Sequence, residues 1–211
     1  MKKGLLFLLF TLIAVTGYSQ VSWNVKAGMN LSNWSGDQGT DAKVGYKVGA
    51  GMEYAFDKTW SLQPSLFLTS KGAKASENVD VDANSDGNIE NIGVDVTINQ
   101  VYLELPVNVQ GRFAIANNAN IVLAAGPYLA YGIAGKTSGK AKLSDLSYKV
   151  EQDTFGDSGL KKFDAGVGVG ISLELSKIIV GLEGQWGLTK LGDGEDVPKN
   201  INFGINVGYR F

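Results

Sequence analysis

The stretch that decides the fold is NFGINVGYRF, residues 202–211, in which apolar and polar side chains alternate. Successive side chains of a β-strand point to opposite faces, so the odd-numbered positions from Phe203 to Phe211 form one apolar face that ends in aromatics. The even-numbered positions form a polar, glycine-rich face that includes Arg210. A strand of this kind is typical of a barrel wall between lipid and a polar lumen. We expect the terminal aromatic, Phe211, to be the signal that the barrel-assembly machinery recognises.

Seven earlier segments show the same alternation. They span residues 21–31, 44–56, 60–71, 96–114, 121–134, 162–175 and 178–189. With the terminal segment they give eight strands, and bacterial outer-membrane barrels have an even number. The sequence therefore predicts an all-β fold, an eight-stranded antiparallel up-and-down transmembrane β-barrel.

The connections between these segments alternate strictly between short and long. Residues 57–59, 115–120 and 176–177 form short connections, whereas residues 32–43, 72–95, 135–161 and 190–198 form long polar loops. Transmembrane barrels have short periplasmic turns and longer extracellular loops. The pattern places the long loops outside the cell and both ends of the mature chain in the periplasm.

Residues 1–19 are predicted to be a signal peptide. Lys2 and Lys3 precede an apolar run over residues 5–15, and Gly17 and Ser19 are the small residues expected before a cleavage site at Gln20. Cleavage after Gln20 fits the pattern as well. The apolar run is shorter than the roughly 20 residues that a spanning helix needs. We expect residues 20–211 to form a single outer-membrane barrel domain.

The composition argues against several classes of function. The chain has 19 basic and 21 acidic residues, a formal net charge of −2, which does not favour nucleic-acid binding. It has no cysteine and no histidine, so it lacks thiol chemistry and the commonest general base and transition-metal ligand. We expect a protein that is not an enzyme and has no resident cofactor.

A soluble lipocalin-like barrel is the alternative architecture, with the apolar face turned inward. The aromatic residues favour the membrane barrel, because they lie on the apolar face and mostly near strand ends, as in the aromatic girdles of membrane barrels. These residues are Trp23, Tyr46, Tyr54, Phe56, Trp60, Phe113, Phe163, Trp186, Tyr209 and Phe211. The expected location is the outer membrane of the cell.

Several short segments carry a family resemblance. They are KAGMNLS at 26–32, YLELP at 102–106, GPYL at 126–129, FDAG at 163–166 and the terminal YRF at 209–211. Together they resemble the PorT-like outer-membrane β-barrel family of Bacteroidota, over nearly all of the mature chain. The resemblance implies an eight-stranded outer-membrane barrel. It also implies, through the family's named member, a link to the secretion of surface proteases, and it carries over no catalytic residue.

Ten charged residues fall on the inward face of the predicted strands. The five cations are Lys26, Lys47, Lys71, Arg112 and Arg210, and the five anions are Glu53, Glu104, Asp164, Glu174 and Glu183. Because the interior of an eight-stranded barrel is just wide enough for side chains, we expect these charges to pair. Strand direction places Glu53, Arg112, Glu174 and Arg210 near the periplasmic end. Nearer the middle, we expect Lys26 to pair with Glu104 or Glu183; a narrow proton or ion path is the other interpretation.

The second long loop contains DANSDGNI, residues 82–89. Asp82, Asn84 and Asp86, followed by Gly87, match the front half of a calcium-binding loop. The twelfth position is Gly93 where a bidentate glutamate belongs, and the same residue types are ordinary in a polar turn. Both interpretations stay open, and a calorimetric titration that shows no heat with calcium would exclude the metal site.

The function predicted from the sequence is a structural or surface-interaction role through the extracellular loops. The alternative is an accessory role in protein secretion across the outer membrane, which rests on the resemblance; a narrow channel or a membrane enzyme agrees less well with the residues. The expected partners are outer-membrane lipid, the barrel-assembly machinery and an envelope or extracellular protein.

Overall fold

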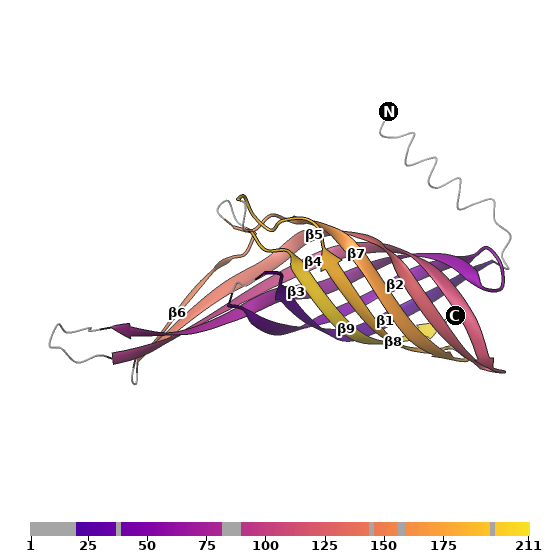
Figure 1. The fold of residues 1–211 in the computed structure, drawn as a ribbon, viewed down its shortest axis with the longest axis horizontal. Coiled ribbons are helices and arrows are strands. Elements are labelled where there is room, and N and C mark those ends of the chain that lie inside the picture. The colour runs from indigo at the N-terminus through magenta and orange to yellow at the C-terminus, as the bar shows by residue number, and fades with distance from the viewer. Residues whose placement is uncertain (1–19, 37–38, 82–89, 144–145, 156–158, 195–196) are drawn as a thin grey trace, which may run out of the picture.

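The computed structural model describes residues 20–36, 39–81, 90–143, 146–155, 159–194 and 197–211. Nine antiparallel strands make up this part of the chain (Figure 1). They are β1 (Val21–Trp34), β2 (Asp41–Ala55), β3 (Trp60–Val81), β4 (Glu90–Ala116), β5 (Ala119–Leu143), β6 (Leu146–Asp153), β7 (Phe163–Leu175), β8 (Ile178–Gly187) and β9 (Asn200–Arg210). No helix among these residues is long and apolar enough to cross a membrane.

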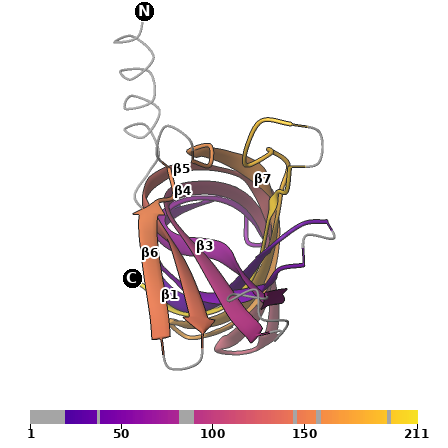
Figure 2. The ribbon, with the colours of Figure 1, turned by 90° about the vertical axis from the view of Figure 1, so that its left-hand side faces the viewer.

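Eight of the strands close into a ring, which confirms the predicted barrel. The hydrogen-bonded order runs from β4 through β3, β2, β1, β9, β8 and β7 to β5, and β5 pairs in turn with β4. The first and last strands are neighbours, in register from Asn24 opposite Arg210 to Trp34 opposite Asn200. Figure 2 shows the ring end-on. Closure removes the free edges that an open sheet would expose to lipid.

The polarity of the barrel is reversed relative to a soluble protein. Lipid-facing side chains such as Met29, Leu129 and Ile205 are 61%, 52% and 54% exposed, whereas Lys71 and Glu104 in the lumen are fully buried. This arrangement excludes the lipocalin-like alternative, in which the apolar face would be turned inward. Toward the end of the lumen opposite the short turns lies a small hydrophobic cluster of Tyr102, Tyr128 and Ala130, with Phe155 packed against it.

The short connections lie at one end of the barrel, the end that carries the C-terminus (Figure 1). In the turn between β2 and β3, the Asp57 carboxylate accepts hydrogen bonds from the backbone N–H groups of Trp60 and Thr59, both at 2.7 Å. These two bonds stabilise the charged form and hold the pKa of Asp57 below its ordinary value. In the turn between β7 and β8, Ser176 adopts a left-handed conformation with φ of 56°.

The prediction of long loops at residues 72–95 and 135–161 was wrong for most of their length. β3 and β4 pair without interruption from Ser70 opposite Val101 to Val81 opposite Glu90. β5 continues beside β4, and β6 then pairs with the far end of β5. The strands β4 and β5 contain 27 and 25 residues, well beyond the roughly 9–11 that cross a membrane. The parts of β3, β4 and β5 that extend beyond the barrel, together with β6, form a four-stranded sheet that projects from it (Figure 1), here called the outer sheet.

Glycines on the lumen face allow close contacts between neighbouring strands. A Cβ added at Gly28, on the seam between β1 and β9, would lie 2.3 Å from the carbonyl oxygen of Ile205. Because that neighbour is backbone, the seam itself would have to move. At Gly168, also on the lumen face, the nearest atom would be at an ordinary 3.4 Å.

We predict that Gly28→Ala destabilises the folded barrel by about 1–3 kcal/mol, the usual cost of overpacking. Gly168→Ala is the matched control and should leave stability nearly unchanged. The measurement is urea unfolding in lipid vesicles, read by tryptophan fluorescence, with heat-modifiable gel migration as a second check. Equal stability of the two variants would contradict this account of the closing seam.

Candidate functional site

The lumen is filled by the ten charged residues that the sequence placed on the inward face. They come from seven of the eight barrel strands, and every carboxylate among them takes part in an ion pair. Lys43 is a further buried cation, whose ammonium group donates to the Ser70 hydroxyl at 3.2 Å. Sequence reasoning missed Lys43 because the predicted strand began one residue later, although Lys43 shares the parity of Lys47.

At the end that carries the short turns, the lumen is closed by the four charges that were predicted to share one layer. Arg112 donates to Glu53 with Nη1 at 2.7 Å and Nη2 at 3.0 Å, and to Glu174 with Nε at 2.9 Å. Arg210 approaches the same two carboxylates at 3.5 and 3.4 Å. The planar guanidinium group of Arg112 can serve two carboxylates at once, which an ammonium group cannot do with the same geometry.

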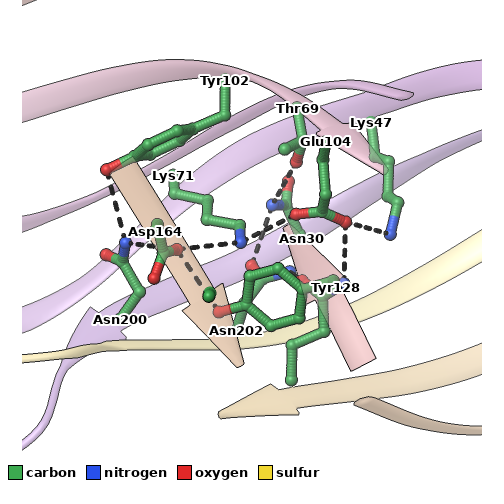
Figure 3. A network of polar contacts seen from close by, with 12 residues as sticks. Asn30, Lys47, Thr69, Lys71, Tyr102, Glu104, Tyr128, Asp164, Asn200 and Asn202 are labelled. Carbon is green, nitrogen blue, oxygen red and sulfur yellow. Dashed lines mark hydrogen bonds and ion pairs between the residues drawn. The ribbon is translucent and has the colours of Figure 1, made fainter. Parts of the chain in front are cut away.

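A second network occupies the middle and outer lumen (Figure 3). Glu104 accepts ion pairs from Lys47 at 3.1 Å and from Lys71 at 2.8 Å, and a hydrogen bond from Gln185 at 2.8 Å. Lys71 also approaches Asp164 at 3.6 Å and lies 4.3 Å from the centre of the Tyr128 ring. These contacts pair charges that burial has taken from water.

The predicted pair of Lys26 with Glu104 or Glu183 was wrong. Lys47 takes both carboxylates, with Glu183 at 2.7 Å, and Lys26 has no ion pair with any described residue. The reason lies in the register between strands. One row of paired residues crosses the strands from Glu183 on β8 through Gly204 on β9 and Asn30 on β1 to Gly45 on β2. Along β2, Lys47 is two residues from this row, whereas along β1 Lys26 is four residues from it.

Lys26 instead lines a small cavity between the two networks. The cavity has a volume of about 60 Å³, and Asn108, Gln110 and Asn206 also line it. A single water needs roughly 10–15 Å³ by the same kind of measure, so the cavity can hold a few waters and no larger solute.

The outer sheet is a second candidate site. On the face that continues the lumen wall, Ala75, Val96, Gly139 and Val150 form one row across the four strands, and Glu77, Val94, Ala141 and Tyr148 form the next. The opposite face carries Lys74, Thr97, Ser138 and Glu151 in one row, and Ser76, Asp95, Lys140 and Lys149 in the next. One face is therefore largely apolar and the other polar and charged.

Comparison with known proteins adds the family. A family model described as "Outer membrane protein beta-barrel domain" matches residues 16–193. The chain belongs to this family. It is accordingly an outer-membrane β-barrel protein, located where the sequence predicted.

Solved structures similar to this barrel protein share little sequence with it. Ail of Yersinia pestis is 15% identical, with 91% of this chain and 99% of that chain covered and a TM-score of 0.43. Neisserial surface protein A is 10% identical, with 90% and 97% covered and a TM-score of 0.46. OprG from Pseudomonas aeruginosa is 13% identical, with 92% and 98% covered and a TM-score of 0.42. A comparison with curated protein sequences found no match.

The candidate calcium ligands of this barrel protein, Asp82, Asn84 and Asp86, lie outside the described residues. Within the described ranges, no group of three or more acidic, histidine or cysteine side chains is arranged to hold a metal ion. The calcium loop stays a prediction from the sequence.

We predict that Arg112→Met destabilises the barrel by about 3–5 kcal/mol, because it leaves two buried carboxylates with only the more distant Arg210. Lys26→Met is the matched control, since it also removes an inward cation but breaks no ion pair with a described residue. The measurement is urea unfolding in lipid vesicles, followed by the fluorescence of the four tryptophans. A larger loss for Lys26→Met than for Arg112→Met would contradict the role assigned to the charge layer at the end with the short turns.

Proposed function

We propose that this outer-membrane barrel is a non-enzymatic surface protein that binds another protein through the outer sheet. One observation carries the proposal. Tyr148 and Val150 on β6 are 66% and 69% exposed, although they lie beyond the barrel, where no lipid covers them. Apolar side chains gathered on one face in water are typical of interaction sites.

The form of the outer sheet supports a protein partner. Its apolar rows are bordered by charged side chains on the reverse face, and protein interfaces commonly combine an apolar centre with a polar rim. The reverse face is also hollowed, by a groove of about 470 Å³ lined by Lys74, Asp95, Lys140 and Lys149 among others. β6 is hydrogen-bonded to β5 alone, so its other edge has no strand partner among the described residues.

The filled lumen supports a function outside the barrel and not through it. Two ion-pair networks block the interior, and the space between them is about 60 Å³. The non-enzymatic role rests on the composition, which has neither histidine nor cysteine. We infer a structural or binding role in preference to a pore or a membrane enzyme.

An accessory role in protein secretion is the second candidate. It rests on the segments 102–106, 126–129 and 163–166, which resemble the PorT-like family of Bacteroidota. Under this candidate the partner at the outer sheet is itself a secretion component, and removing the chain lowers the amount of secreted surface protein. Both candidate functions include the predicted signal peptide at residues 1–19 and the predicted recognition of Phe211 by the assembly machinery.

We predict that a photo-crosslinking amino acid at position 148 captures a discrete protein in intact cells. The same amino acid at Phe56, an exposed aromatic at the opposite end of the barrel, serves as the control and should not give that product. Val150→Ser should weaken the capture at position 148, because it removes the neighbouring apolar contact, while heat-modifiable migration shows that the barrel still folds. No protein product at position 148, or the same product at both positions, would contradict the proposal.

A further inference from the structure

The barrel wall has a notch near its outer end, where β5 changes partner. β5 pairs with β7 as far as Tyr131 opposite Phe163, and with β6 from Lys136 opposite Asp153 onward. Across the interval, the backbone N–H of Gly132 donates to the Lys162 carbonyl at 2.6 Å, and that of Thr154 donates to the Gly135 carbonyl at 3.1 Å. The notch is a groove of about 530 Å³, a size within the usual range of ligand sites.

The lining of this notch is amphipathic. Its apolar part consists of Val101, Ile133 and Ala134, with Phe155 behind them. Ile133 is 54% exposed, so no other described part of the protein covers it. The chemistry of this part of the groove suits a hydrocarbon chain.

The polar part of the notch is cationic on balance. Lys136 and Lys162 line it together with a single carboxylate, that of Asp153. Lys162 has no ion pair with a described residue, and Lys136 lies 3.8 Å from Glu151 with both side chains exposed. Exposed pairs of this kind are weak, so both ammonium groups are available to an anion.

The position of the notch relative to the membrane surface agrees with its division into an apolar part and a cationic part. Tyr131 and Phe163 are opposite each other at its lower border and are 54% and 51% exposed on the outside of the barrel. Exposed aromatics at this position form the girdle that marks the interface between lipid and water. The apolar part of the notch therefore adjoins the lipid-facing band, and Lys136 and Lys162 lie at the level of the headgroups.

We propose that the notch binds one anionic lipid of the outer leaflet. An acyl chain lies on Val101, Ile133 and Ala134, and the phosphate or carboxylate of the headgroup contacts Lys136 and Lys162. Lipid is favoured over a protein because the groove is continuous with the lipid-covered surface and its excess charge is positive. The site is independent of the protein partner proposed for Tyr148 and Val150, which lie on the other face of the outer sheet.

The test uses the full barrel reconstituted in vesicles of phosphatidylcholine and phosphatidylglycerol with identical acyl chains. After mild detergent extraction, native mass spectrometry counts the lipids that stay bound. Two lysine contacts predict a preference on the order of tenfold for the anionic lipid. The double variant Lys136→Gln/Lys162→Gln should lose this preference, since the removed charges supply it.

The control variant is Lys58→Gln/Lys177→Gln, which removes two exposed lysines from the short turns at the opposite end. It should keep the preference of the unmodified protein. Equal retention of both lipids by the unmodified protein would overturn the proposal, and so would loss of the preference in the control variant as well. Co-purification of a protein that is displaced by Lys136→Gln/Lys162→Gln, with no bound lipid, would assign the notch to a protein and would also overturn it.

Discussion

Closure of eight strands into a narrow ring is the constraint on which the rest of this structure depends. Half of the side chains must then lie in an interior that has little room for water, and the polar ones need partners there. Arg112 shows the consequence, because its guanidinium group binds Glu53 and Glu174 and so joins strands that are distant in the sequence. Farther along the lumen, Glu104 joins β4 to β2 through Lys47, and Lys71 joins β3 to β7 through Asp164. Charge pairing across the lumen thus replaces the apolar core of a soluble protein.

The same constraint is the reason why we propose a function on the outside of the barrel. A lumen occupied by two ion-pair networks leaves little space for a solute, whereas the extra length of β3, β4 and β5 builds a sheet beyond the membrane. Along its length, β5 changes its pairing partner from β7 to β6, and this change has two effects. It supplies the fourth strand of the outer sheet, and it opens the notch beside Ile133. The features that can bind a partner or a lipid therefore both arise from one irregularity of the wall.

Alternation with a period of two predicted the eight barrel strands and their inward and outward faces. It also placed Glu53, Arg112, Glu174 and Arg210 in one layer, because these residues lie near strand ends, where the level is easily counted. It failed to predict the environment of Lys26, since the depth of a mid-strand residue in the lumen depends on the register across several strands. It also missed β6, although Leu146, Tyr148 and Val150 alternate with polar residues there, because this short alternation lies inside the segment 135–161 that is predominantly polar and was predicted to be one loop.

The central claim is that the outer sheet lies on the cell surface while the short turns lie in the periplasm. Single-cysteine labelling tests it directly, because the chain has no cysteine of its own. Tyr148→Cys and Lys58→Cys are each exposed to a maleimide that cannot cross the outer membrane, in intact cells and after lysis. The account predicts that Cys at position 148 reacts in intact cells and that Cys at position 58 reacts only after lysis. Labelling of position 58 but not 148 in intact cells would contradict it.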